Sequence, residues 1–151
     1  MIKIKNDKGF TLIELLAVIV VLAIILVITV PMVLNTLSST RQDALQASAN
    51  STATFYKEQL ALAALGKQES GFVTDATFTN GILVAKSERC ITSDEATILG
   101  LNNTDYSIST EIASCSKVSW DANGIATVVL KGKSGGKFTN GNTVLEATSG
   151  Q

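Results

Sequence analysis

An uninterrupted apolar run constrains this chain more than any other feature of its sequence. From Phe10 to Leu34 the residues are almost all aliphatic, and the only charged side chain among them is Glu14. The run is about 25 residues long, so as an α-helix it extends about 37 Å, enough to cross the roughly 30 Å hydrocarbon core of a bilayer. The segment therefore predicts a membrane-spanning helix with one acidic residue near its start.

The helical pattern continues beyond the apolar run without a break. Apolar and small residues recur at steps of three and four from Leu37 to Ala63, which is the stripe of an amphipathic helix. No glycine lies between Gly9 and Gly66, and Gly66 is placed to end the helix. We expect one helix over residues 10–65, with an apolar half (10–34) and an amphipathic half (35–65).

The remainder of the chain, residues 66–151, is polar and predicts a small β-rich domain. Residues 66–80 have the composition of a loop, and Thr92 with Glu95 has the capping-box spacing of a short helix over 93–99. Strand-like segments follow at 118–120 and 125–131 around an Asp-Ala-Asn-Gly turn, and a second turn signal precedes residues 143–145. The expected fold class is α+β, with the amphipathic half-helix covering one face of a small antiparallel sheet.

Charge and composition exclude several classes of function. The 12 basic and 13 acidic residues nearly cancel, so the chain lacks the electrostatic footprint of a nucleic-acid-binding protein. It contains no histidine, which excludes Ser-His-Asp and Cys-His nucleophile activation and imidazole metal ligands. Asp94-Glu95 is the only adjacent acidic pair, and a helix N-terminus explains it better than an acid–base site. We predict no catalytic residue, no metal site and no cofactor.

The distribution of basic residues predicts the orientation in a membrane. Three lysines lie within residues 1–9, and the next basic residue is Arg41. Positive flanks stay in the cytoplasm, so the residues after the span should lie outside. Cys90 and Cys115 then belong to an exported segment, and their even number favours one disulfide, worth about 3–4 kcal/mol from closing its loop. The alternative is two unpaired thiols.

Three interpretations compete for the N-terminal segment. A secretory signal peptide needs an apolar region of about 7–15 residues followed by a small-x-small site, which this chain does not offer. A plain transmembrane anchor fits the length but not Glu14, because an acid costs about 2.5–3.5 kcal/mol at the bilayer centre. The third rests on residues 8–15, KGFTLIEL, a glycine followed by Phe-Thr-Leu-Ile-Glu at the opening of an apolar helix. This octapeptide resembles the processing signal of type IV prepilins and the related pseudopilins.

The resemblance implies a specific processing and assembly route. Residues 1–9 would be a leader, a prepilin peptidase would cleave between Gly9 and Phe10, and Phe10 would be N-methylated. The protein would have the pilin fold and no enzymatic activity. It would wait in the cytoplasmic membrane as a single-pass protein with its C-terminus outside. An assembly platform and motor would then add it to a helical, homo-oligomeric filament on the cell surface that serves adhesion, motility or DNA uptake. The alternative is a pseudopilin of a type II secretion or competence apparatus, because the processing signal is shared.

Glu14 and Pro31 are the two positions expected to act in assembly. Cleavage would make Phe10 an α-amine with a reference pKa near 7.7–8.0, one helical turn from Glu14. Glu14 could pair with its own amine, favour the positive end of the helix dipole, or pair with the amine of a neighbouring subunit, and the resemblance favours the neighbour. Pro31 removes a helical hydrogen bond and follows four β-branched residues, 27–30. Similar proteins lose helicity here within the filament, but alanine replaces their upstream glycine at position 23, so local melting and a kink both stay open.

Overall fold

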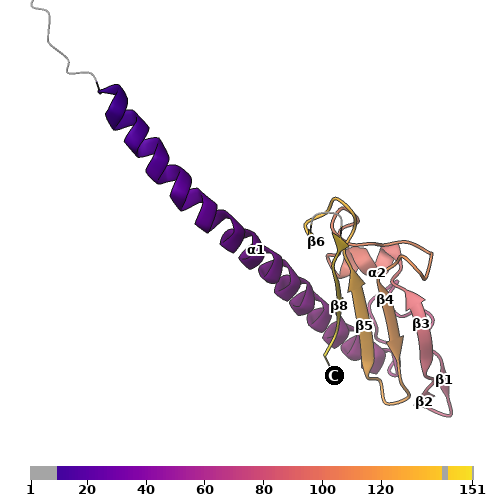
Figure 1. The fold of residues 1–151 in the computed structure, drawn as a ribbon. Helices are drawn as coiled ribbons and strands as arrows, with labels where there is room; N and C mark the ends of the chain where they lie inside the picture. Colours follow the sequence, from indigo (N-terminus) through magenta and orange to yellow (C-terminus); the bar gives the residue numbers. More distant parts are fainter. Residues whose placement is uncertain (1–9, 141–142, 151) are drawn as a thin grey trace, which may run out of the picture. The chain divides into compact units, whose positions relative to one another are not determined.

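The structure is a computed structural model that describes residues 10–140 and 143–150. The chain forms two compact units, the first ending at Leu37 and the second beginning at Ser38. One helix, α1 (Leu12–Ala63), passes through both, and the second unit contains a second helix and all the strands (Figure 1).

The end of α1 follows from its glycine. Gly66 has φ of +66°, a conformation that glycine adopts without a steric penalty. The N–H of Lys67 donates to Leu62 O and the N–H of Gly66 donates to Ala63 O, both at 3.0 Å, which is the paired pattern of a Schellman cap. The predicted long helix is confirmed, but it ends at Ala63 rather than residue 65 because the cap takes up residues 64–66.

A four-stranded antiparallel sheet forms one layer of the second unit. Its order is β3 (Lys86–Cys90), β4 (Lys117–Trp120), β5 (Ala126–Lys131) and β8 (Glu146–Thr148), as Figure 1 shows. Two small hairpins accompany it: β1 (Phe78–Thr79) with β2 (Ile82–Leu83), and β6 (Thr139–Asn140) with β7 (Thr143–Val144). The α+β prediction is confirmed.

The core lies between this sheet and the part of α1 that belongs to the second unit. Alternate residues of β5 are buried, as expected of a strand with one covered face. The predicted helical stripe supplies the opposing surface, with Leu45, Tyr56 and Leu60 all at most 2% exposed. Phe72 packs against Tyr56 with ring centroids 4.6 Å apart. The stripe of steps of three and four therefore marks the core-facing side of the helix.

The short helix α2 (Ser93–Ile98) begins at the predicted capping box. Thr92 Oγ1 accepts from the N–H of Glu95, and the Glu95 carboxylate accepts from the N–H of Thr92. The structure also joins Cys90, the last residue of β3, to Cys115, with their Cα atoms 5.7 Å apart. The bond closes a ring that contains α2.

Several strands depart from the sequence-based expectation. Residues 66–80 are not wholly a loop, because Phe78 and Thr79 form β1. β3 was not expected, since its sequence KSERC shows no apolar alternation and every residue of the strand is exposed or half-buried. Hydrophobic alternation reports burial, so a polar strand at the edge of a sheet gives no such signal.

Candidate functional site

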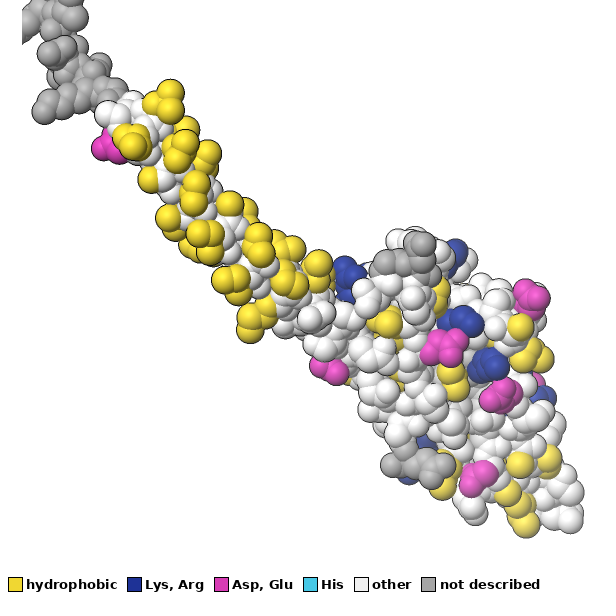
Figure 2. Space-filling model, in the orientation of Figure 1, with side chains coloured by type: hydrophobic (Ala, Val, Ile, Leu, Met, Phe, Trp, Pro, Cys, Tyr) yellow, Lys and Arg dark blue, Asp and Glu magenta, His cyan; other side chains and the backbone are white. Residues whose placement is uncertain are grey.

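The apolar half of α1 presents its side chains outward on every side. Every large hydrophobic side chain from Phe10 to Leu34 is exposed, including Leu22 at the centre of the run, which is 51% exposed. Figure 2 shows hydrophobic side chains along the visible face of this helix. Among the described residues α1 is the one helix long and apolar enough to cross a membrane, by length and composition. A helix that is apolar all round is stable when lipid or other helices surround it.

Glu14 lies in the first turn of this helix, where it forms a second capping box. Its Oε2 accepts from the N–H of Thr11 at 2.9 Å and from the Thr11 hydroxyl at 2.8 Å, and Thr11 Oγ1 accepts from the N–H of Glu14 at 3.3 Å. Thr11 is thus the N-cap, and α1 begins at Leu12 rather than at residue 10. The capping box places the Glu14 carboxylate at the positive end of α1, and its pairing with an α-amine, which requires the cleaved chain, stays a prediction.

Thr11 is a site residue that sequence reasoning missed. The spacing Thr11-x-x-Glu14 is the capping-box signature that was used to find α2, and it precedes an apolar run in the same way. The cap at Thr11 is therefore recognisable from the sequence alone.

The structure places the other predicted site residues as follows. Phe10 is 89% exposed and precedes the cap, whereas Gly9 lies outside the described residues. Pro31 lies inside α1, which is helical on both sides of it. Cys90 and Cys115 are bonded to each other in the second unit. Of the predicted site residues, Glu14 therefore contacts Thr11, the residue after Phe10. Pro31 and the two cysteines lie elsewhere in the chain.

A network of ion pairs surrounds the buried Glu95 in the second unit. The Arg89 guanidinium donates to both carboxylate oxygens of Glu95, at 2.8 and 2.6 Å, and its Nε lies 2.8 Å from Asp75 Oδ2. Glu95 is 2% exposed and also accepts from the N–H of Val73. Asp94 and Glu95 lie at a helix N-terminus as predicted, but of the two only Glu95 is buried and bonded to Arg89.

Opposing effects set the charge state of Glu95. Burial raises the pKa of its carboxyl, but the hydrogen bonds from Arg89 and the N–H of Thr92, with the Arg89 charge, outweigh burial and hold that pKa below its usual value. Burial and the neighbouring Glu95 charge together raise the pKa of Tyr56. Both groups are held in their ordinary neutral-pH charge states, which is the pattern of a structural ion pair rather than of an acid–base catalyst.

A groove of about 1020 Å³ runs beside α2 in the second unit. Hydroxyl, amide and aliphatic side chains line it, and Arg89, its one charged residue, is paired with Glu95. Within residues 10–140 and 143–150, no cluster of three or more Asp, Glu, Cys or His side chains could hold a metal ion.

Comparison with known proteins identifies the N-terminal segment. Residues 4–30 match the family described as the prokaryotic N-terminal methylation motif. Comparison with curated proteins and with solved structures gives no match. The matched residues include Glu14 with its capping partner and most of the exposed apolar half of α1. The chain thus carries the methylation motif typical of type IV pilins and pseudopilins, joined to an α+β fold consistent with theirs.

Proposed function

We propose that the protein is a structural subunit of a type IV pilus, held in the membrane as a precursor and then assembled through its apolar half-helix. The observation that carries this proposal is the lone acid, Glu14, one turn inside a fully exposed apolar helix at the methylation motif. Such a helix needs a membrane before assembly and other helices after it. A lone carboxylate within it needs a cation.

The first step is cleavage between Gly9 and Phe10 by a prepilin peptidase, followed by N-methylation of Phe10. The motif match supports this step because it spans the bond. A peptidase acts on extended backbone, and glycine before the bond offers little steric hindrance. The capping box supports the same boundary, because α1 is helical only from Leu12, two residues beyond the cleaved bond.

The second step gives Glu14 a charged partner. Cleavage converts the Phe10 nitrogen into a cationic α-amine at neutral pH. Among the described residues of the single chain, the Glu14 carboxylate accepts only from the uncharged groups of Thr11. Among apolar helices the amine of a neighbouring subunit is a stronger partner. A register that leaves Glu14 without an amine is disfavoured, so the pair selects the register of assembly.

The third step transfers the half-helix from lipid to a bundle of identical half-helices. Lipid tails and neighbouring helices are about equally apolar, so little hydrophobic free energy changes. Packing and the Glu14 pair then decide the geometry, and an external motor supplies the work. Pro31 marks the part of α1 where one helical hydrogen bond is already absent, so the helix bends or unwinds there most easily during packing.

Substitution of Glu14 tests the pairing. Glu14→Ala removes the carboxylate and should leave leader cleavage intact while filaments on the cell surface fall at least tenfold. Thr29→Ala is the matched control, because it removes a polar group of the same helix whose hydroxyl donates to Ile25 O. It should assemble normally. Wild-type filament yield from Glu14→Ala would refute the pairing.

The intact mass of protein sheared from cells tests the processing. We expect the mass of residues 10–151 with one added methyl group. Protein that still begins at Met1 would refute the whole proposal. Long filaments on the cell surface would identify a pilus, whereas short structures confined to the envelope would identify a pseudopilus.

A further inference from the structure

The outer edge of β8 is covered by side chains of α1. β8 is the last strand of the four-stranded sheet, and among the described residues no strand pairs with its outer edge. The backbone groups of Leu145 and Ser149, which flank β8, point toward β5. Leu145 O accepts from the N–H of Gly132, and the N–H of Ser149 donates to Val128 O. Because the backbone groups of an antiparallel strand alternate in direction, those of residues 146, 148 and 150 face away from the sheet. Unpaired groups of this kind are a template for pairing with another chain.

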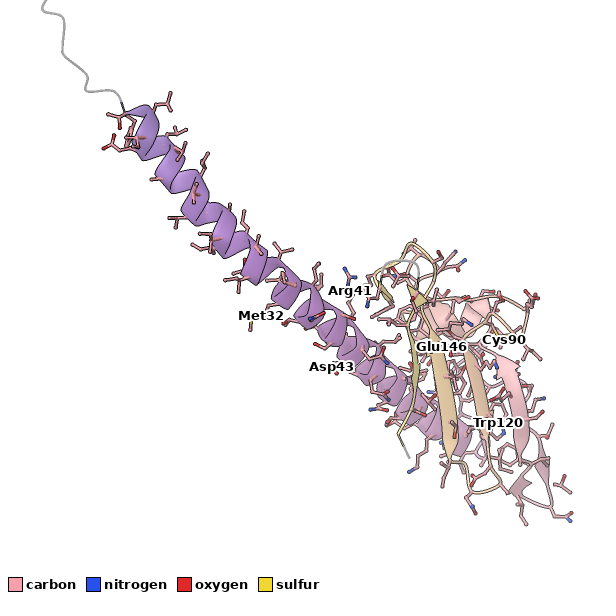
Figure 3. The ribbon with its side chains drawn as sticks, viewed as in Figure 1. Met32, Arg41, Asp43, Cys90, Trp120 and Glu146 are labelled. Carbon is pink, nitrogen blue, oxygen red and sulfur yellow. A yellow bond between two sulfur atoms is a disulfide. The ribbon has the colours of Figure 1, made fainter. Side chains whose placement is uncertain are left out.

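Three amide side chains of α1 each bond one outward backbone group, on residues 146, 148 and 150 in turn. Gln42 Nε2 donates to Glu146 O at 2.9 Å, and Gln46 Nε2 donates to Thr148 O. Asn50 Oδ1 accepts from the N–H of Gly150 at 2.9 Å. We call these three residues the amide ladder. In Figure 3, Glu146 is labelled on β8 and Arg41, the residue before Gln42, on α1.

The repeat distances of a helix and a strand explain why the ladder fits. Residues four apart on a helix lie about 6 Å apart along its axis, and residues two apart on a strand lie about 6.8 Å apart. The ladder residues are four apart, and the backbone groups that they meet are two apart. An amide side chain carries both a donor and an acceptor, so one residue type can bond either a carbonyl or an N–H.

We propose that the amide ladder closes the edge of β8 against strand pairing with a second copy of this chain. Neighbouring bonds extend the contact along the same C-terminal segment, since Arg41 Nη1 donates to Thr139 O and Asn140 Nδ2 donates to Ser38 Oγ. The ladder thereby keeps the C-terminal strand in its own sheet. The inference concerns only residues 38–150 and is independent of the N-terminal motif.

The test removes the amides while keeping the length of the side chains. A Gln42→Met/Gln46→Met variant of the full chain, purified in detergent micelles, loses two ladder bonds without losing helix-forming residues. We expect the Ser149 amide to exchange with deuterium about tenfold faster or more, because each lost bond weakens the hold on β8. The Val118 amide, in the central strand β4, should keep its wild-type rate. We also expect the variant to self-associate in sedimentation at concentrations where the wild type does not.

Two further variants distinguish edge pairing from general loosening. Ser51→Ala changes an exposed α1 position outside the ladder and should behave as wild type. Adding Thr148→Pro to the double Met variant should abolish the self-association. The N–H of Thr148 faces away from β5, so this proline blocks a new strand without breaking the native sheet.

Each result decides the proposal. Fast Ser149 exchange with association that Thr148→Pro abolishes supports it. An unchanged exchange rate, no association, or association that persists with Thr148→Pro would overturn it.

Discussion

Replacing Glu95 by alanine should destabilise the second unit far more than its position on a short helix suggests. The change removes a carboxylate that is 2% exposed and leaves the Arg89 guanidinium, itself 16% exposed, with Asp75 as its remaining ion-pair partner. It also leaves the buried N–H of Val73 without its acceptor and breaks the capping box at Thr92.

The magnitude follows from these losses. Removing one partner of a buried ion pair costs about 3–5 kcal/mol, because the other charge stays buried and uncompensated. The Asp75 carboxylate, 2.8 Å from Arg89 Nε, offsets part of this loss. The orphaned N–H of Val73 adds about 1–3 kcal/mol. We expect the free energy of unfolding to fall by about 3 kcal/mol or more.

Trp120 provides the assay. It is the only tryptophan in the chain, it is 3% exposed, and the Arg89 guanidinium lies 5.3 Å from its ring centroid. Its fluorescence in a urea titration of the full chain in detergent therefore reports unfolding around this network. Asp94→Ala is the matched control: the neighbouring acid is exposed, so its removal should cost only the helix-dipole contribution of about 0.3–1 kcal/mol. A Glu95→Ala loss no larger than that of Asp94→Ala would refute the reasoning.

Two further predictions concern acid and the disulfide. The folded-state pKa of Glu95 lies below its ordinary value of 4.5, because hydrogen bonds from Arg89 and Thr92 outweigh burial. Its contribution to stability is therefore complete above about pH 4.5 and is lost as pH falls through the lower folded-state pKa. Urea titrations at several acidic pH values should show a steeper loss in the wild type than in Glu95→Ala, and parallel curves would contradict this. Replacing Cys90 and Cys115 by serine should lower the free energy of unfolding by about 3–4 kcal/mol, read from the urea midpoint, and an unchanged midpoint would show that the bond contributes nothing.

The sequence predicted features that rest on local signals. Gly66 and the Thr92–Glu95 spacing act within one helical turn, and both mark a helix end in the structure. The core-facing side of α1 was likewise predictable, because its stripe from Leu45 to Leu60 reflects a helical period.

What the sequence did not reveal depends on partners far along the chain. The capping-box spacing distinguishes Glu95 from Asp94 as a cap, but it does not reveal the ion pair with Arg89, because Arg89 belongs to a strand that has no apolar pattern. The amide ladder was also not recognisable, since Gln42 meets Glu146 across 104 residues. Polar residues on a helix usually face solvent, so their sequence does not indicate that they bond the edge of a strand.

The position of the disulfide separates a segment that tolerates changes in length from one that does not. The covalent ring closes across 25 residues, from the end of β3 to just before β4, and contains α2 and the segment after it. Its two ends are held by the sheet, so inserted residues between them would lengthen a tethered loop at a cost of only about 0.6 kcal/mol per doubling. The exposed residues 110–113 within this ring can therefore vary without altering the register of β3 on β4, whereas Leu101 and Tyr106 of the same ring are buried in the core. The C-terminal segment has no such covalent closure, and its length is constrained by the spacing of the α1 side chains that hold it.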